Sequence, residues 1–457
     1  MDRVDHFGRD LFVVLDRNGD RPLRVQLEEQ LREGVRSGRL HAGTALPSTR
    51  ALAAELGVAR GVVVEAYGQL VAEGFLVARR GAGTRVARVA PGEPPPAALA
   101  ARLAPARFDF RAEAADRSAF PRRPWLAAAR RALADAPDTD LGYGAWPGAP
   151  ALRVALAAYL GRARGVVAQP ERIVVTAGIT QAIALLAAVL RRRGARRVIV
   201  EDPGFWPHRT LLARAQLEAM PVAADDGGLR TDALPAADAA LVTPAHQWPT
   251  GAVLAPERRA ALLDWATAHD ALVLEDDYDG EYRYDREPVG ALQGLGAKHV
   301  VYMGSTSKTL APALRLGWMV LPGDLAATLA EERGWADGGS PVLDQLTLAA
   351  FVERGELDRH LRRMRLRFRR RRDAVVAALG RHLPEAPVGG AAAGLHVTVA
   401  LAPGTDVGAV LARARARGVG VFAAEHDGRP LLLVGYANIA DAAIDRGVRA
   451  LAAAVRG

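Results

Sequence analysis

Hydrophobic residues near the start of the chain recur at helical spacing in three successive segments, at residues 22–38, 48–57 and 60–74. Ser48 is a good N-cap for the second segment, and a glycine ends each of the three. Two short strand-like runs follow, Phe75–Ala78 and Thr84–Val89. Three helices and a hairpin predict a winged helix-turn-helix over residues 20–89, after a lead-in at 1–19.

A second pattern begins beyond a proline-rich stretch. Residues 91–96 contain four prolines, which predicts a linker over residues 90–107. After it, short apolar runs alternate with helical patterns: Arg172–Thr176, Val198–Glu201, Ala239–Thr243, Ala271–Leu274, Val300–Met303 and Leu316–Val320. Such alternation is typical of α/β proteins with a mostly parallel sheet and helices on both faces. We expect this domain to cover residues 108–457, with a smaller α+β lobe over about 325–457.

Composition narrows the class of protein. The 457 residues include no cysteine, which excludes disulfides, thiolate metal sites and cysteine nucleophiles, and suits a reducing cytoplasm. The first twelve residues are too polar for a signal peptide, and no run of about 18 apolar residues is long enough to span a membrane. The net charge of +9 permits nucleic-acid binding.

Basic side chains lie where a winged helix contacts DNA. Arg50 opens the second predicted helix and Arg60 opens the third, while Arg79, Arg80 and Gly81 lie at the tip of the hairpin. Helix N-termini and arginines suit phosphates and groove edges. A helical interaction module without a DNA role is the alternative. Residues 359–372 hold nine more arginines, a pattern that fits one long solvated helix better than a second nucleic-acid patch.

The rarest basic residue points to covalent chemistry. Only Lys298 and Lys308 are lysines among 60 basic residues. Arginine stays protonated, whereas a partly buried lysine can lose its proton and form an imine with an aldehyde such as pyridoxal phosphate. Lys308 follows a buried strand, so it is the candidate for this chemistry. Lys298 lies in a glycine-rich loop and is typical of a surface.

The neighbours of Lys308 suit such a ligand. Ser305, Ser307 and Arg315 offer hydroxyls and a forked cation to a phosphate. Asp276 and Tyr278 follow an earlier buried strand and offer a carboxylate to a pyridinium and a phenol to a ring hydroxyl. Two further groups complete the predicted site, an anion-binding turn before a helix and an aromatic ring for stacking: Gly178, Ile179, Thr180 and Phe205.

A nucleotide hydrolase is excluded by spacing. The phosphate loop of such enzymes needs glycine directly before its lysine and another five residues further back, but Ser307 and Tyr302 stand there.

Three motifs resemble one family. The segments HQWPTG at 246–251, EDDYDGEYRY at 275–284 and GSTSKTLAPALRLGW at 304–318 closely resemble the MocR-type regulators. In these bacterial proteins a GntR-type winged helix precedes a fold-type-I aminotransferase-like domain. The resemblance implies pyridoxal 5'-phosphate on Lys308, a homodimer that binds operator double-stranded DNA, and regulation by the cofactor or by a small amine or amino acid.

The resemblance also concerns single residues. It implies that Tyr143, in a glycine-rich loop, reaches a phosphate in the partner subunit. His246 either contacts the cofactor or is structural. Full aminotransferases carry an arginine in the C-terminal lobe for the substrate carboxylate, but the run Leu433–Asn438 has none. We therefore favour a regulator that senses the cofactor, as do family members that control pyridoxal phosphate synthesis. A working aminotransferase with an accessory DNA-binding domain stays open as the alternative.

Overall fold

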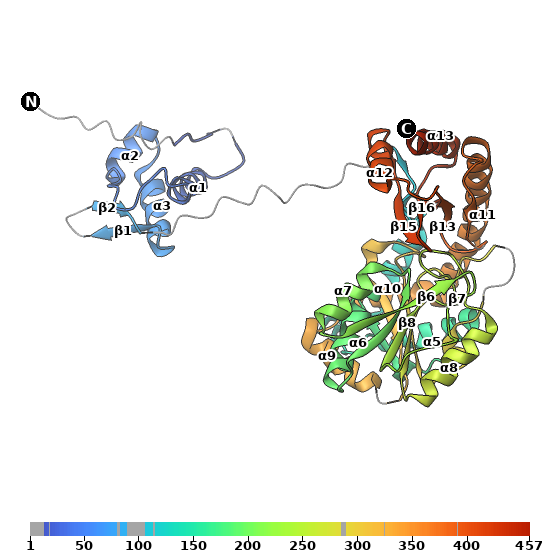
Figure 1. The fold of residues 1–457 in the computed structure, drawn as a ribbon. Helices are drawn as coiled ribbons and strands as arrows, with labels where there is room; N and C mark the ends of the chain where they lie inside the picture. The colour runs from blue at the N-terminus through green and yellow to red at the C-terminus, as the bar shows by residue number, and fades with distance from the viewer. Residues whose placement is uncertain are drawn as a thin grey trace, which may run out of the picture. The chain divides into compact units, whose positions relative to one another are not determined.

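The computed structural model describes residues 13–17, 19–79, 83–88, 106–112, 115–284, 289–323, 325–390 and 392–457. The chain forms two compact units, which meet in sequence between residues 104 and 105 (Figure 1). No helix among these residues has both the length and the apolar character that a membrane crossing requires.

The first unit contains three helices and a two-stranded hairpin: α1 (Leu23–Arg36), α2 (Thr49–Leu56), α3 (Arg60–Ala72), β1 (Leu76–Arg79) and β2 (Gly83–Val86). The predicted cap is confirmed, since the Ser48 hydroxyl accepts a hydrogen bond from the Ala51 N–H, and Gly57 ends α2 in the left-handed region. Apolar side chains from all three helices meet in one core, among them Leu27, Leu31, Leu52, Val63 and Leu70.

The segment before α1 belongs to this unit, although the sequence suggests a loose lead-in. Val13 and Leu15 pack against the core. The side-chain amides of Gln26 and Gln30, one turn apart on α1, each bind both the N–H and the carbonyl of the segment, at Asp16 and Val14 respectively. The domain therefore starts before residue 20.

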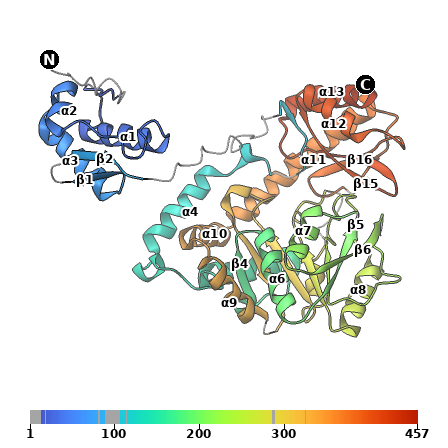
Figure 2. The same ribbon diagram turned by 60° about the vertical axis from the view of Figure 1, so that its left-hand side comes forward.

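The second unit is built on an eight-stranded sheet in the order β4-β11-β10-β9-β8-β5-β6-β7 (Figure 2). Its strands are β4 (Ile173–Thr176), β5 (Arg197–Asp202), β6 (Glu218–Asp225), β7 (Gly228–Leu229), β8 (Ala239–Val242), β9 (Leu272–Asp276), β10 (Val300–Ser305) and β11 (Gly317–Val320). Neighbours from β10 through β9, β8 and β5 to β6 are parallel, while β11 pairs antiparallel with β10 and β4, and β7 with β6. The predicted mostly parallel sheet is confirmed.

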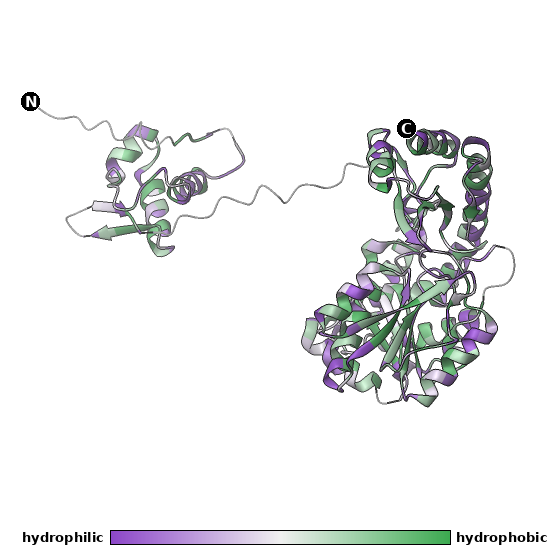
Figure 3. Ribbon diagram, viewed as in Figure 1, coloured by the Kyte–Doolittle hydropathy of each residue, from purple (hydrophilic) through white to green (hydrophobic). Residues whose placement is uncertain are grey.

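Both faces of this sheet are buried under helices. Successive side chains of a strand point to opposite faces, so each strand contributes to two cores. On β5, Val198 and Val200 join the core under α6, whereas Ile199 joins the core under α8. Figure 3 accordingly shows the strands of the sheet mostly in the hydrophobic colour. The helices of this part are α4 (Arg122–Asp135), α5 (Pro150–Arg164), α6 (Ile179–Arg192), α7 (Trp206–Arg214), α8 (Pro256–Ala268), α9 (Leu325–Asp337) and α10 (Val342–Glu353).

The C-terminal lobe begins later than the sequence suggests. Helix α9 packs on α6 and β4, and α10 packs on α4 and α5, so both belong with the part built on the large sheet. The lobe itself consists of the elements α11 (Glu356–His382), β12 (Val388–Gly389), β13 (His396–Ala400), α12 (Val407–Ala416), β14 (Val419–Gly420), β15 (Phe422–His426), β16 (Arg429–Gly435) and α13 (Ile444–Arg456). Four strands form an antiparallel sheet in the order β12-β13-β16-β15. The remaining strand, β14, pairs in parallel with β3 (Phe108–Asp109) from the start of the unit.

Candidate functional site

A cavity of about 250 Å³ lies where the parallel strands of the large sheet end. Its lining comes from the starts of α6 and α7 and from the segments after β8, β9 and β10. Open α/β sheets bind ligands at this edge, because several strand ends deliver side chains to one place. The predicted residues that line it are Ile179, Thr180, Phe205, Asp276, Tyr278, Ser305, Ser307, Lys308 and Arg315.

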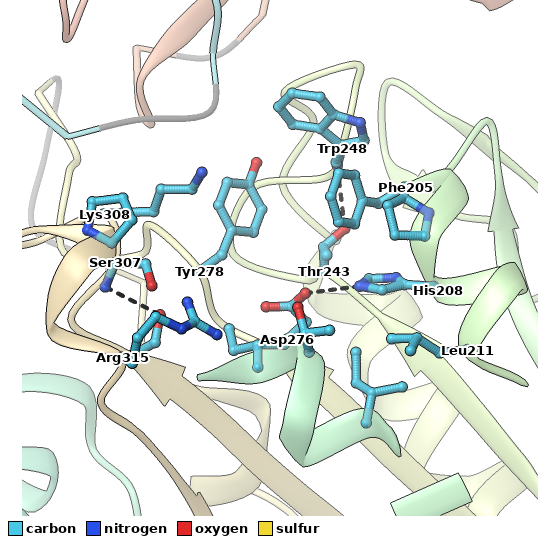
Figure 4. Close-up of a pocket in the computed structure, with 16 residues that line it drawn as sticks. Phe205, His208, Leu211, Thr243, Trp248, Asp276, Tyr278, Ser307, Lys308 and Arg315 are labelled. Carbon is cyan, nitrogen blue, oxygen red and sulfur yellow. Dashed lines mark hydrogen bonds and ion pairs between the residues drawn. The ribbon is translucent and has the colours of Figure 1, made fainter. Parts of the chain in front are cut away.

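Lys308 lies three residues beyond the end of β10. Its side chain and that of Tyr278 point toward the same space (Figure 4). The other lysine, Lys298, lies in the turn before β10, at the opposite end of that strand. Of the two lysines, Lys308 is thus the one in the cavity, as predicted from its position after the strand.

Asp276 ends β9 and is buried in the cavity wall. Its Oδ2 lies 3.1 Å from Nε2 of His208, which is also buried, whereas Oδ1 has no hydrogen-bond partner in the described part of the chain. A buried acceptor without a donor is costly. A ligand that brings an N–H to this point would satisfy Oδ1.

His208 was missed by the sequence analysis. It lies one helical turn after Phe205, at the start of α7, and the two rings meet edge to face with centroids 5.2 Å apart. That spacing could have identified His208 from the sequence, since side chains one helical turn apart lie on the same surface of the helix.

The opposite end of the cavity suits an anion. Gly178 has φ of +104° and precedes α6, whose first backbone N–H groups lack helical acceptors. A Cβ at Gly178 would lie 3.2 Å from Nη2 of Arg315, so the guanidinium lies directly against this glycine. Arg315 also donates to the carbonyl of Ala177, and the N–H of Ser307 lies 3.4 Å from the Ser305 hydroxyl. Donors and a cation therefore converge at this end of the cavity, and their binding of a phosphate stays a prediction.

The Tyr278 phenol stays protonated. Burial raises its pKa well above the usual value, and the nearby carboxylates of Asp279 and Asp276 add to this. Its oxygen lies 2.8 Å from Nδ1 of His246, which also lies 3.0 Å from Oδ2 of Asp279. His246 does not line the cavity and contacts it through Tyr278.

Strand alternation separates this cavity from a second polar cluster behind it. Asp276 and Tyr278 face the cavity, whereas Glu275 and Asp277 point the other way. There Asp277 forms a bidentate ion pair with Arg164, at 2.8 and 3.0 Å. Glu275 accepts the N–H groups of Leu292 and Gln293. Burial first, and then the charge of Asp277, raises the pKa of Glu275 to about 7.

Tyr143 is not part of the cavity within one chain. It is 96% exposed in the loop before α5. The implied contact with a partner subunit stays a prediction.

The first unit presents its predicted DNA contacts on the surface. Arg50, Arg60 and Arg79 are exposed, and among the residues described none of them pairs with a carboxylate. The Nε of Arg60 lies 3.4 Å from the Thr49 hydroxyl, so the starts of α2 and α3 lie together. Arg80 and Gly81 fall outside the described residues.

Comparison with known proteins agrees with both units. Residues 116–451 match the family of class I and II aminotransferases, and residues 23–86 match the gntR family of bacterial regulatory proteins. The probable rhizopine catabolism regulatory protein MocR of Rhizobium meliloti is 36% identical over 396 residues, which are 82% of this chain and 80% of that protein. The HTH-type pyridoxine biosynthesis transcriptional regulator PdxR of Corynebacterium glutamicum is 35% identical, over 91% of each chain.

Solved structures resemble the second unit. Pyrococcus horikoshii kynurenine aminotransferase, determined in complex with PMP, has a TM-score of 0.70 and 25% identity over 76% of this chain and 90% of its own. LysN, an α-aminoadipate aminotransferase of Thermus thermophilus complexed with N-(5'-phosphopyridoxyl)-L-leucine, has the same TM-score and identity over 77% and 92%. Pyridoxal phosphate is the standard cofactor of this aminotransferase family. With a gntR domain followed by a class I and II aminotransferase domain, and with similarity to MocR and PdxR over at least 80% of each chain, the chain belongs to the MocR-type transcriptional regulators.

Proposed function

We propose that this regulator binds operator double-stranded DNA as a homodimer and that pyridoxal 5'-phosphate, held at Lys308, changes its DNA affinity. The alternative effector at the same cavity is a small amine or amino acid. One observation carries the proposal. Lys308, the unpartnered Oδ1 of Asp276 and the Arg315 guanidinium beside Gly178 all meet at one cavity of about 250 Å³. Because operator DNA is part of the chromosome, the proposal also places this regulator in the cytoplasm.

The residues of the cavity fit the cofactor at both of its ends. When bound, pyridoxal phosphate supplies an aldehyde and an electron-withdrawing ring. The amine of Lys308 would hold the aldehyde carbon covalently, and Oδ1 of Asp276 would accept the ring N–H. His208 fixes the orientation of that carboxylate through Oδ2. The Tyr278 hydroxyl would bond the ring oxygen.

The phosphate and the flat ring have their own partners. Ser305, Ser307, Arg315 and the N-terminus of α6 would bind the phosphate through hydroxyls, a guanidinium and backbone N–H groups. Phe205 would stack on the ring, and Trp248 supports it edge to face at 5.7 Å.

Exposed apolar side chains support a dimer of the second unit. Large side chains on or near α4, α9 and the loop before α5 face solvent in the single chain: Leu126, Leu133, Leu141, Tyr143 and Trp335. Burying such apolar groups in an interface with a second subunit stabilises a dimer. Two winged helices in one dimer would read two half-sites, so the operator should contain paired repeats.

DNA titrations test the proposal. Operator DNA is titrated with cofactor-free protein, with cofactor-loaded protein and with Lys308→Ala, at fixed salt because phosphate contacts are screened. Lys298→Ala is the matched control, since it removes the chain's other lysine outside the cavity. A ligand shifts the DNA equilibrium only if it binds two states unequally, so loading should change affinity in wild type and in Lys298→Ala but not in Lys308→Ala. Equal affinity in all samples would remove the sensor function.

Covalent attachment has its own test. Borohydride reduction of the loaded protein followed by peptide mass mapping should place the cofactor on Lys308. A cofactor found on Lys298, or on neither lysine, would contradict the assignment.

A second function is a working aminotransferase with an accessory DNA-binding domain. It is favoured by the complete set of Lys308, Asp276 and Tyr278 in the cavity. The absence of an arginine in the run Leu433–Asn438 weighs against tight binding of a substrate carboxylate. Turnover of amino donors with a 2-oxo acid, without any effect of the cofactor on DNA affinity, would favour the enzyme.

A further inference from the structure

His246 lies where the large sheet meets the C-terminal lobe. It is 2% exposed and belongs to the loop after β8. On one side it contacts Tyr278 and Asp279, which follow β9. On another, the backbone of Gly394 packs against its ring, because a Cβ there would lie 2.0 Å from Cε1 of His246. Gly394 comes two residues before β13 of the lobe, so one imidazole contacts both parts of the unit.

With Asp279 ionised, the position of the His246 proton decides how Tyr278 can bond. Tyr278 Oη and Asp279 Oδ2 lie 2.8 and 3.0 Å from this nitrogen, which carries at most one proton. If Nδ1 carries the proton, it donates to Asp279, and the Tyr278 hydroxyl is free to donate into the cavity. If the neutral ring carries its proton on Nε2, Nδ1 accepts from Tyr278, and the phenol oxygen offers only lone pairs to a ligand.

The choice also changes what His246 presents to the lobe. Nε2 of His246 has no hydrogen-bond partner in the described part of the chain, and neither has Nδ1 of His396. The two rings lie with centroids 5.1 Å apart. Since Nε2 of His396 lies 3.0 Å from the carbonyl of Pro249, which can only accept, His396 donates through Nε2. Its Nδ1 is therefore an acceptor when the ring is neutral.

Neutrality of His396 follows from its surroundings. Burial first, and then the neighbouring His246 and Lys308, lowers the pKa of His396 to about 3. Burial also raises the pKa of Asp279, while His246 and Lys308 oppose that rise. The groups that act on His246 are thus Tyr278, Asp279, His396 and, from the cavity, Lys308.

We propose that His246 is a positioning residue that couples the cavity to the C-terminal lobe. Its Nδ1 determines whether the Tyr278 hydroxyl donates a hydrogen bond to the ligand or accepts one from it. The rest of the ring packs against Gly394 and His396. A ligand oxygen that accepts from Tyr278 favours one arrangement and thereby alters the contact with the lobe. The inference rests on the proposed binding of pyridoxal phosphate. It adds the route by which that binding reaches β13.

The test uses full-length protein with pyridoxal phosphate as the probe and three variants. His246→Phe fills the ring position but cannot hydrogen-bond. His246→Asn keeps an amide near the position of Nδ1 but does not exchange tautomers. His299→Asn is the matched control, since His299 lies before β10, at the end of that strand remote from Lys308.

Two readouts separate a coupling role from a structural one. The first is the pH midpoint of the visible absorption band of the bound cofactor. We expect His246→Phe to move it by about one unit, the usual size of a shift from one lost hydrogen-bonded neighbour, and His246→Asn to restore part of that shift. The second is amide hydrogen exchange over residues 393–400. Cofactor should change it in wild type and His299→Asn but not in His246→Phe or His246→Asn.

The outcomes distinguish this inference from the proposed function. If wild type binds no pyridoxal phosphate, the proposed function itself is wrong. If all variants bind the cofactor with the same pH midpoint and the same exchange response as wild type, His246 does not couple the two parts. Should His246→Phe not fold, His246→Asn alone decides through the exchange response of the lobe.

Discussion

Replacing Arg164 with leucine would remove the cation from a buried ion pair behind the cavity. The side chains of Arg164 and Asp277 are 1% and 0% exposed, and two N···O contacts of 2.8 and 3.0 Å join them. Removing one partner of such a pair costs about 3–5 kcal/mol, because the remaining charge is buried without compensation. Asp277 would keep the hydrogen bond from the Tyr302 hydroxyl at 2.8 Å. We therefore expect a loss near the lower end, about 3 kcal/mol.

Tryptophan fluorescence in a denaturant titration measures this loss selectively. All seven tryptophans lie beyond residue 105, so their emission reports the unfolding of the second unit alone. Arg162→Leu is the control, since its pair with Asp358 is 59% and 31% exposed and such pairs contribute under about 1 kcal/mol.

The double variant Arg164→Leu/Asp277→Asn tests the cause of the loss. Without the buried charge of Asp277 it should recover more than half of the lost stability. The reasoning would be refuted if Arg164→Leu cost no more than Arg162→Leu. A double variant that is less stable than the single one would show that uncompensated charge is not the cause.

Three further predictions concern the cofactor, DNA and pH. Asp276→Ala should raise the dissociation constant for pyridoxal phosphate about tenfold or more, because one charge-assisted hydrogen bond is lost. It should also change the visible absorption band, and an unchanged band and affinity would contradict the role of Asp276. Arg50→Ala and Arg60→Ala should each weaken DNA binding and lower the slope of log affinity against log salt by about 0.9, with the cofactor spectrum unchanged; an unchanged slope would exclude a phosphate contact. Because the pKa of Glu275 is raised from 4.5 to about 7, the folded state holds the proton more tightly, so stability should fall between these pH values and level off above them. Glu275→Gln should reduce this pH-dependent loss of stability by about 3 kcal/mol, as thermal melts across this pH range would show.

Much of the fold was predictable because its elements leave local signals. Parallel strands buried on both faces appear as short apolar runs, and Ser48 and Gly57 mark the ends of α2 by their own chemistry. Residues at or just after strand ends, such as Asp276 and Lys308, could be assigned to one site, because the ends of parallel strands lie at one edge of the sheet.

Other features depend on packing between distant segments, which leaves no periodic trace. Arg164 meets Asp277 across 113 positions of sequence. His208 becomes part of the site only because α7 lies beside the end of β9. The sequence analysis placed α9 and α10 in the C-terminal lobe because the sequence of a helix does not tell which neighbours it packs on.

The pairing of β3 with β14 has a consequence for the order of folding. Residues 108–109 leave the ribosome long before residues 419–420, so the strand that follows the first unit has no partner until synthesis is nearly complete. Among the described residues, the core of the first unit ends at Val86, so it can form early. Pairing so distant in sequence must overcome a large loop-closure entropy and is slow. In a nascent chain, we therefore expect the DNA-binding domain to be folded well before β3 finds its partner strand.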